Sequence, residues 1–340
     1  MPEVVSIGID ASQFPENVAL ARCESLRTRQ INHKFLYESY KQSQKWLAVH
    51  QAHSPWKSDL NLAATYDAAF VAAARRVSAP HVHVIGLGCG DGQKDARLLH
   101  MLGAAAKGVS YLPVDVSMPL VLMAHQAACE VLAPRNARLE TRNVSGLVCD
   151  LASADDLSIT FNQQTPPAAI RLLTFFGLIP NFEPQLILPK LRALVRPNDL
   201  LLLSANLAPG HDYEAGVRRI LPQYDNAPTR DWLLTFLFDL GVENRDGDIQ
   251  WSVETSDTRD LLRVTASFRF TQRRVLRFGE ETFAFAAGET IRLFFSYRYT
   301  PDRVRTVLAT HGLAVEDQWI ADSEEEGVFL CTPRNSVADD

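Results

Sequence analysis

The sequence has no apolar run long enough to cross a bilayer, and no basic segment at its N-terminus of the kind that marks a secretory signal. It has no excess of positive charge either. Its 40 acidic and 34 basic residues give a formal net charge of −6, which excludes the electrostatic footprint of a DNA- or RNA-binding protein. Cysteine is scarce, with five among 340 residues and no C-x-x-C pair, so we expect no disulfide framework and no metal site. These absences predict a cytoplasmic protein that binds neither nucleic acid nor membrane.

What the sequence does have is a glycine-rich segment between an apolar run at 82–85 and a helical pattern at 93–107. Glycine occupies every second position from Gly86 to Gly92. Glycines in a strand-to-helix turn let backbone N–H groups come close to a ligand. Asp115 ends the next predicted strand, where a carboxylate can accept hydrogen bonds from both hydroxyls of a ribose. The loop and the acid together predict a site for a nucleotide or for S-adenosylmethionine (SAM).

The spacing of the glycines favours SAM over other cofactors. A dinucleotide site would read G-x-G-x-x-G, with a third glycine that packs the helix on the strand, and a P-loop would contain G-K-[S/T]; neither occurs here. A SAM site also needs an adenine slot after the third strand. Asp150 follows a strand-like segment and is predicted to accept a hydrogen bond from the adenine amino group. The alternative for Asp150 is the N-cap of a following helix.

The order of predicted elements indicates an α/β fold. Apolar runs and helical patterns alternate from residue 81 onward, which favours a parallel sheet covered by helices on both faces. We expect strands near 82–86, 109–115, 138–148, 170–176 and 199–205, and helices near 93–107, 117–132 and 184–195.

The pattern changes after residue 208. Two helical stretches, 213–220 and 232–240, precede alternating apolar residues over 248–297 that predict antiparallel strands with Phe268, Phe270, Phe283 and Phe285 in their core. Thr300 and Pro301 predict the start of a helix that ends at Gly312. Strands at 313–320 and 327–332 complete the sequence. Before residue 81 we expect helices at 31–50 and 58–77, and a partly extended segment over 1–30.

These elements predict a Rossmann-like class I methyltransferase sheet with a second α+β region that binds substrate. The SAM-binding core would comprise 81–207 and 300–333, and the inserted region 208–299. Residues 1–80 would form a helical part of the substrate region, and 334–340 a tail. The insertion is equally suited to shape a pocket or a dimer contact, so the sequence leaves a homodimer open.

Five short segments, in this order and spacing, occur in one known family: Gly86-Leu87-Gly88 with Lys94, then Pro113–Ser117, Phe176–Phe182, Leu194–Asp199 and Ala286–Arg292. Between about residues 54 and 332 the chain resembles the histidine-specific SAM-dependent methyltransferases. That family includes the histidine Nα-methyltransferase of ergothioneine biosynthesis and fungal enzymes that N-methylate dimethylallyltryptophan.

The resemblance implies which residues bind the cofactor. Asp115 would hold the ribose and Asp150 would face the adenine. Gly86 and Lys94 would lie along the methionine portion. The full set implied for SAM, and for S-adenosyl-L-homocysteine (SAH) as the product, is Gly86, Gly88, Gly90, Lys94, Asp115, Val116, Asp150 and Leu151.

The resemblance also implies a substrate site. Asn181 would contact the amino-acid part of the substrate, Tyr224 would contact the substrate, and Ser296 would recognise its side chain. Methyl transfer from a sulfonium is an in-line displacement in which the protein mainly positions the nucleophile. An amine must arrive neutral, and Asn181 and Tyr224 are the residues expected to orient it as catalytic groups.

Two positions depart from the family pattern. Phe294 stands where the family has the glutamate that grips the imidazole of histidine. His53-Ser54-Pro55 replaces a Tyr-Tyr-Pro pattern, so a tyrosine that helps close the substrate pocket is missing. A pocket built to hydrogen-bond imidazole loses its discrimination when the acceptor becomes a phenyl ring. The expected substrate is therefore an aromatic or apolar amino acid, or another small amine, rather than histidine.

Two further interpretations remain open from the sequence. The protein could methylate an oxygen or sulfur nucleophile or a peptide in a biosynthetic pathway, although no clear general base can be placed for oxygen transfer. It could also be a non-catalytic SAM-binding partner in a biosynthetic complex. The glycines, Asp115 and Asp150 favour retained cofactor binding but say nothing of turnover.

Overall fold

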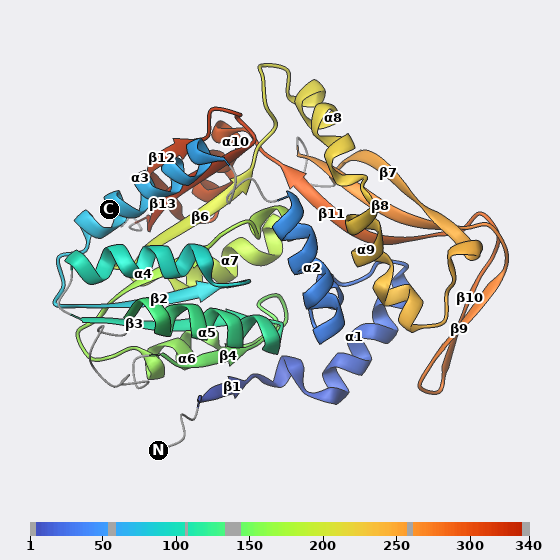
Figure 1. The fold of residues 1–340 in the computed structure, drawn as a ribbon, viewed down its shortest axis with the longest axis horizontal. Helices are drawn as coiled ribbons and strands as arrows, with labels where there is room; N and C mark the ends of the chain where they lie inside the picture. The colour runs from blue at the N-terminus through green and yellow to red at the C-terminus, as the bar shows by residue number, and fades with distance from the viewer. Residues whose placement is uncertain (1–4, 54–58, 106–107, 133–143, 257–260, 335–340) are drawn as a thin grey trace, which may run out of the picture. The chain divides into compact units, whose positions relative to one another are not determined.

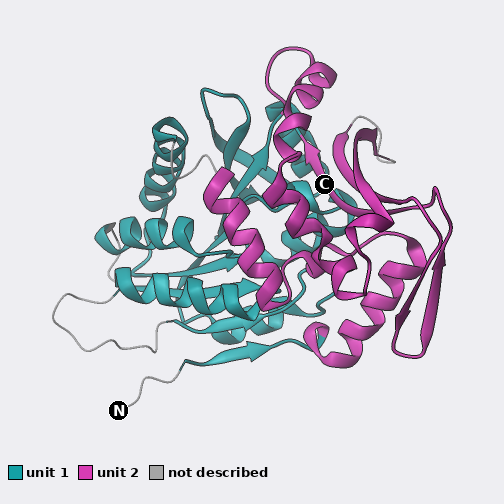
Figure 2. Cartoon of the chain, turned by 45° about the vertical axis from the view of Figure 1, so that its right-hand side comes forward, with its two compact units in different colours: residues 1–11, 55–207, 299–340 teal, residues 12–54, 208–298 magenta. Residues whose placement is uncertain are grey.

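The computed structural model describes residues 5–53, 59–105, 108–132, 144–256 and 261–334. The chain divides into two compact units (Figure 2). The first, here called the sheet unit, comprises 1–11, 55–207 and 299–340. The second, here called the antiparallel unit, comprises 12–54 and 208–298.

The sheet unit is built on eight strands in the order β1-β4-β3-β2-β5-β6-β13-β12 (Figure 1). The first six in that order pair in parallel, and β13 is antiparallel to both β6 and β12. The strands are β1 (Ile7–Ile9), β2 (His81–Leu87), β3 (Gly108–Asp115), β4 (Gly146–Val148), β5 (Ile170–Phe175), β6 (Leu200–Asn206), β12 (Leu313–Ile320) and β13 (Glu326–Pro333). This is the predicted α/β class I methyltransferase sheet.

Helices cover the sheet, whose central strands β2, β3, β5 and β6 are almost entirely buried. Every residue of β2 after His81 is buried, as expected for a parallel strand packed on both faces. Three helices, α3, α4 and α5, pack side by side and share one apolar cluster with the strands (Figure 1). The helices of the unit are α3 (Leu60–Arg76), α4 (Gln93–Ala105), α5 (Met118–Leu132), α6 (Leu157–Gln164), α7 (Pro184–Leu194) and α10 (Pro301–Thr310).

Helix α3 belongs to the sheet unit, which differs from the expected boundary at residue 80. Its side chains Leu62, Tyr66 and Phe70 are buried in the same cluster as Leu98 of α4 and Leu202 of β6. A helix with an apolar stripe at this spacing must bury it against a partner, and here the partners are the sheet and α4. The part of the N-terminal region that joins the antiparallel unit is therefore 12–54 rather than 1–80.

The antiparallel unit contains a three-stranded sheet in the order β11-β8-β7 and a separate hairpin. Its strands are β7 (Gly247–Thr255), β8 (Leu262–Phe270), β9 (Arg274–Phe278), β10 (Glu281–Phe285) and β11 (Thr290–Arg298), and its helices α1 (Pro15–Thr28), α2 (Tyr40–His53), α8 (Tyr213–Tyr224) and α9 (Ala227–Asp239). The predicted core of four alternating phenylalanines is confirmed, because Phe268, Phe270, Phe283 and Phe285 are all buried.

Some local predictions were wrong. The helix expected over 31–50 is a 3₁₀ turn at His33–Leu36 followed by α2. Helix α1 lies where a partly extended segment was expected. The helix was not recognised because only Ser25 and Leu26 in it are buried, so it has no apolar stripe to mark it. Of the strand expected at 138–148, residues 138–143 lie outside the described residues. In the described part, the strand is β4. Most of the predicted tail, 335–340, also lies outside them.

A buried ion pair joins the N-terminal ends of β5 and β6, opposite the edge that carries the glycine loop. The side chains of Arg171 and Asp199 are each 1% exposed, and the Asp199 carboxylate accepts hydrogen bonds from Arg171 Nε at 2.7 Å and from the backbone N–H of Arg196 at 2.9 Å. Removing one member of such a pair leaves an uncompensated charge in the protein interior.

We therefore expect Asp199→Ala to lower the free energy of unfolding by about 3–5 kcal/mol. The matched control is Glu214→Ala, which removes the exposed i, i+4 pair with Arg218 and should cost less than about 1 kcal/mol. Urea denaturation of both variants measures the difference. Equal losses of unfolding free energy in the two variants would contradict a special contribution of the buried pair of Arg171 and Asp199 to stability.

Candidate active site

The glycine loop leaves the carboxyl end of β2 and enters α4. Gly88, Gly90 and Gly92 have φ angles of +62°, +53° and +73°, a backbone region that side chains disfavour. The N–H groups of Gly88 and Cys89 donate to the carbonyl oxygen of Val114 at 2.7 and 3.1 Å, which ties the loop to β3. A Cβ on Gly92 would lie 2.4 Å from Ala124 Cα, so no larger residue fits there.

Asp115 ends β3 beside this loop. Its Oδ2 accepts a hydrogen bond from the Gly90 N–H at 3.2 Å, and its Oδ1 accepts one from the Ser117 N–H at 2.9 Å. Burial raises the pKa of the carboxyl to about 6, although both N–H donors act to lower it. Val116 continues the chain at this edge of the sheet. The carboxylate therefore lies where the sequence predicted a ribose-binding acid, next to bare glycine backbone.

Asp150 follows β4 at the same edge. The backbone N–H of Cys149 donates to the carbonyl oxygen of Asp115 at 2.9 Å, which joins the two strand ends. The Asp150 carboxylate accepts from the Ala152 N–H at 3.0 Å and from the Ser153 hydroxyl at 2.8 Å. The alternative of a helix N-cap is wrong, because α6 begins at Leu157 and Asp150 closes a separate turn. Leu151, in that turn, is buried.

Lys94, in the first turn of α4, is held by residues distant in sequence. Its ammonium donates to the Tyr66 hydroxyl at 2.6 Å and lies 3.4 Å from Glu326 Oε1. The Tyr66 hydroxyl in turn donates to Glu326. Burial and the Glu326 charge raise the pKa of Tyr66, so the phenol stays protonated. Sequence reasoning missed Tyr66 and Glu326, because α3 and β13 meet α4 only in the folded sheet.

Sequence reasoning also missed Asp95, which lies beneath the glycine loop. The carboxyl is 3% exposed, and it accepts hydrogen bonds from the Tyr111 hydroxyl at 2.6 Å and the Thr174 hydroxyl at 2.8 Å. Burial raises its pKa to about 6. A Cβ on Gly86 would lie 2.2 Å from Asp95 Oδ2, so the carboxyl occupies the space that a side chain at 86 would need.

Asn181 lies in a short 3₁₀ turn after β5. Its backbone N–H donates to the carbonyl oxygen of Leu178 at 2.8 Å, and its side chain is half-buried. Because β5 pairs directly with β2, this turn and the glycine loop lie at the same edge of the sheet. The sheet unit thus brings together the carboxyl ends of four adjacent strands, with Asp150, Asp115, the glycine loop and Asn181 in that order.

The three substrate residues predicted in the antiparallel unit form one cluster. The Tyr224 hydroxyl donates to Ser296 Oγ at 3.0 Å and accepts a hydrogen bond from Arg298 Nη2 at 2.7 Å. The Tyr224 ring lies 5.8 Å from the Phe294 ring and 5.9 Å from that of Trp251. Arg298 and Trp251 were not anticipated. These five residues are called the Tyr224 cluster below.

Phe294 is also part of the core of its unit. Its ring is 6% exposed and lies 6.1 Å from Trp232 and 5.3 Å from His33. The pairing of β11 with β8 is interrupted by a bulge between Arg292 and Phe294, which sets the direction in which the following side chains point. The Pro55 departure predicted from the sequence lies outside the described residues.

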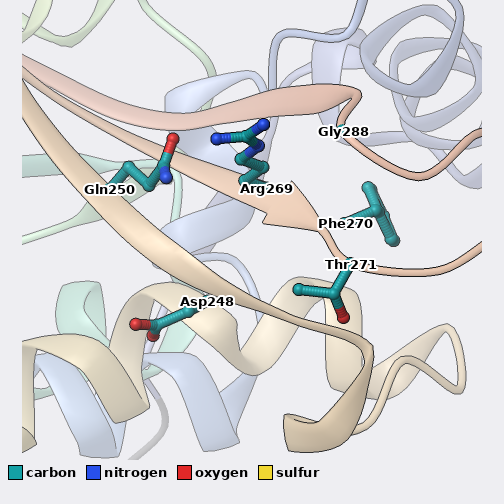
Figure 3. Close-up of a pocket in the computed structure, with 6 residues that line it drawn as sticks. All are labelled: Asp248, Gln250, Arg269, Phe270, Thr271 and Gly288. Carbon is teal, nitrogen blue, oxygen red and sulfur yellow. The ribbon is translucent and has the colours of Figure 1, made fainter.

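A hollow of about 350 Å³ lies elsewhere on the antiparallel unit (Figure 3). It is lined by Asp248, Gln250, Arg269, Phe270, Thr271 and Gly288. None of the predicted site residues lines it. Its walls are the end of β8, the start of β7 and a neighbouring glycine turn, so we assign it no role in methyl transfer.

Among the residues that the structure describes, no group of three or more His, Cys, Asp or Glu side chains could hold a metal ion. Two histidines of β2, His81 and His83, both contact the Ser110 hydroxyl, at 3.0 and 2.7 Å. Within the same described ranges, no helix is both long and apolar enough to cross a membrane.

Comparison with protein families gives a match over residues 23–333 to the model described as histidine-specific methyltransferase, SAM-dependent. The chain belongs to this family. The family model describes its members as SAM-dependent, and the glycine loop with its neighbouring carboxylates fits that cofactor. The bare loop backbone admits close approach, and Asp115 offers an acceptor beside it.

Individual relatives are more distant. The chain is similar to N-methyltransferase fsqC of Aspergillus fumigatus, with 25% identity over 250 residues; the match spans 72% of this chain but only 64% of that relative. Among solved structures, magnesium protoporphyrin IX methyltransferase from Synechocystis PCC 6803 with bound SAH gives a TM-score of 0.48 at 14% identity, covering 89% of this chain and 98% of that one. The 1,6-didemethyltoxoflavin-N1-methyltransferase of Burkholderia thailandensis gives 0.44 at 11% identity, covering 86% and 87%.

The glycine loop generates a first test. We expect Gly92→Ala to lower the free energy of unfolding by about 1–3 kcal/mol and to weaken SAM binding, since a Cβ there meets the backbone of α5 and the φ angle is positive. Gly103→Ala on α4 is the control. Its Cβ meets open space, so it should stabilise the protein by about 0.5–1 kcal/mol. Thermal unfolding and titration calorimetry measure the two effects; unchanged SAM binding in Gly92→Ala would contradict the placement of the cofactor.

The raised pKa of Asp95 generates a second test. In the unfolded chain an aspartate titrates near 4, so the folded state holds the proton more tightly and stability falls as pH rises through about 4 to 6. Asp95→Asn removes this dependence. Relative to the wild type, the variant should gain up to about 3 kcal/mol between pH 4 and pH 7 in the ligand-free protein.

Urea denaturation at a series of pH values measures this gain. Asp302→Asn, at a side chain 87% exposed in the first turn of α10, should show no such gain and serves as the control. A difference between Asp95→Asn and wild type that stays constant with pH would show that Asp95 titrates normally.

Proposed function

We propose that the protein transfers a methyl group from SAM to the nitrogen of a small amine or amino acid other than histidine. Membership of the family supports methyl transfer, and the name of the Aspergillus relative, an N-methyltransferase, supports nitrogen as the acceptor atom. The observation that carries the proposal is the make-up of the Tyr224 cluster. It combines aromatic rings, two hydroxyl groups and one guanidinium.

Phe294 is the reason to exclude histidine. An imidazole is recognised by groups that accept from its N–H, and a phenyl ring cannot accept in that way. The ring instead offers apolar surface, together with Tyr224 and Trp251. An aromatic or apolar side chain on the acceptor matches this surface better than a second polar ring does.

The hydrogen bonds of Tyr224 suit it to orient an amine. Arg298 donates to its hydroxyl oxygen and the hydroxyl proton points to Ser296, so rotation about the C–O bond is restrained. A phenolic oxygen can accept a second hydrogen bond, here from an amine N–H. When bound, SAM supplies an electrophilic methyl group on a cationic sulfur. Asn181, from its turn after β5, is proposed to be the second polar contact to the substrate.

The direct test measures transfer from labelled SAM to a panel of free amino acids and biogenic amines that includes histidine. We expect labelled product from an aromatic or apolar amine and none from histidine, because the acceptor pocket lacks the family's carboxylate. Strong histidine methylation would contradict the argument from Phe294. SAM binding without any amine product would favour a different nucleophile, a peptide, or a non-catalytic binding role.

The role of Tyr224 is tested with a pair of variants on the same helix. Tyr224→Phe should lower kcat/KM by about 10- to 100-fold with little change in SAM affinity, since it removes one hydrogen bond to the acceptor. Tyr213→Phe removes a hydroxyl that donates to the backbone carbonyl of Arg298 and accepts from the backbone N–H of Leu262, and it should mainly lower stability. Equal losses of kcat/KM in both variants would indicate a structural role for Tyr224.

A further inference from the structure

A buried carboxylate lies directly beneath the glycine loop and is used by none of the roles assigned so far. Asp95 Oδ2 accepts from Tyr111 at 2.6 Å and Oδ1 accepts from Thr174 at 2.8 Å. These donors come from β3 and β5, the strands on either side of β2, so the carboxyl is fixed under the strand from which the loop departs. Gly86 leaves it room, because a Cβ there would overlap Oδ2.

The surroundings of Asp95 leave a negative charge at this place above about pH 6. The Tyr111 hydroxyl and the Cys89 thiol both have raised pKa values because they are buried, so they are neutral. Lys94 favours the charged form of Asp95 and Asp91 opposes it. The groups that face the carboxyl or act on its charge are Tyr111 from β3, Thr174 from β5, and Cys89, Asp91 and Lys94 from the loop and α4.

The two forms of the cofactor differ by one charge. SAM carries a cationic sulfur, and SAH, formed when the methyl group leaves, carries a neutral one. Both share the ribose, the adenine and the amino-acid end. A buried charge is poorly screened by solvent and counter-ions, so a fixed carboxylate near the loop acts differently on the two forms.

We propose that Asp95 is a positioning residue that holds negative charge beneath Gly86 and thereby favours binding of cationic SAM over neutral SAH. The charge of Asp95 acts on the cofactor across the loop backbone and without direct contact, since the carboxyl is buried and hydrogen-bonded to Tyr111 and Thr174. The proposal rests on the glycine loop as the cofactor site and does not depend on the identity of the methyl acceptor. If so, the protein's affinity for the cofactor falls when the methyl group leaves, and this promotes release of SAH.

Titration calorimetry of SAM and SAH with three proteins tests this proposal. At pH 7.5, Asp95→Asn should weaken SAM binding about tenfold and SAH binding much less. Asp115→Asn tests the site itself, because the ribose is common to both ligands and both affinities should fall. A SAM analogue with a protonated amine in place of the sulfonium should follow SAM.

The pH dependence supplies a readout that a structural role would not move. The preference of the wild type for SAM over SAH should fall below about pH 6, where Asp95 takes up a proton. It should fall less in Asp95→Asn, in which Asp115 is the carboxyl beside the loop that still titrates near this pH. Tyr111→Phe keeps the carboxyl but removes a donor that stabilises its charge, so the loss of preference should move to higher pH.

Equal weakening of SAM and SAH in Asp95→Asn would overturn the proposal and leave Asp95 as a purely structural residue. No change in either affinity would overturn it as well. If Asp115→Asn also left both affinities unchanged, the cofactor site itself would be misplaced. Loss of the amine product in the acceptor panel with these affinities as expected would instead fault only the proposed function.

Discussion

The glycine loop after β2 packs against two buried carboxyl groups, and the arrangement of the sheet edge depends on those contacts. Asp95 lies against Gly86, and Asp115 accepts a hydrogen bond from the Gly90 N–H. Burial raises both pKa values to about 6, so the ligand-free protein gives up stability to keep two carboxylates here at neutral pH. Carboxyl groups with raised pKa values beside a glycine-rich loop are typical of binding sites, where a ligand compensates the cost of burying their charge.

Local sequence was enough to locate the loop and Asp115, because a strand, a turn and a helix start follow one another along the chain. The same is true of most strands of the sheet, whose continuous apolar runs are unambiguous. Asp95, Tyr66 and Glu326 could not be found in this way. Their roles come from partners on other elements, and no spacing in the sequence records that α4 meets both β3 and β13. Helix α1 was missed for a local reason: it buries too few side chains to show a helical pattern of apolar residues.

The residues proposed to bind substrate in the antiparallel unit were predicted through resemblance, and the structure places them in contact with one another. Tyr224, Phe294 and Ser296 come from α8 and β11, and Arg298 completes the set by donating to the same tyrosine hydroxyl. Residues at alternate positions of a strand face the same side, so Phe294, Ser296 and Arg298 share one face of β11. A single change on that face, such as phenylalanine in place of a carboxylate, alters the chemistry of the whole cluster.

Each unit has its own apolar cluster, so a substitution in one unit need not disturb the packing of the other. The cluster around α3, α4 and β2 supports the carboxylates at the sheet edge, and a different cluster around β8, β11 and α9 supports Phe294. Substitutions without shared partners act nearly independently on stability. Phe294 could therefore replace a polar residue at a cost confined to the antiparallel unit. The role proposed for Asp95 concerns instead the charge of the cofactor, which does not depend on the methyl acceptor.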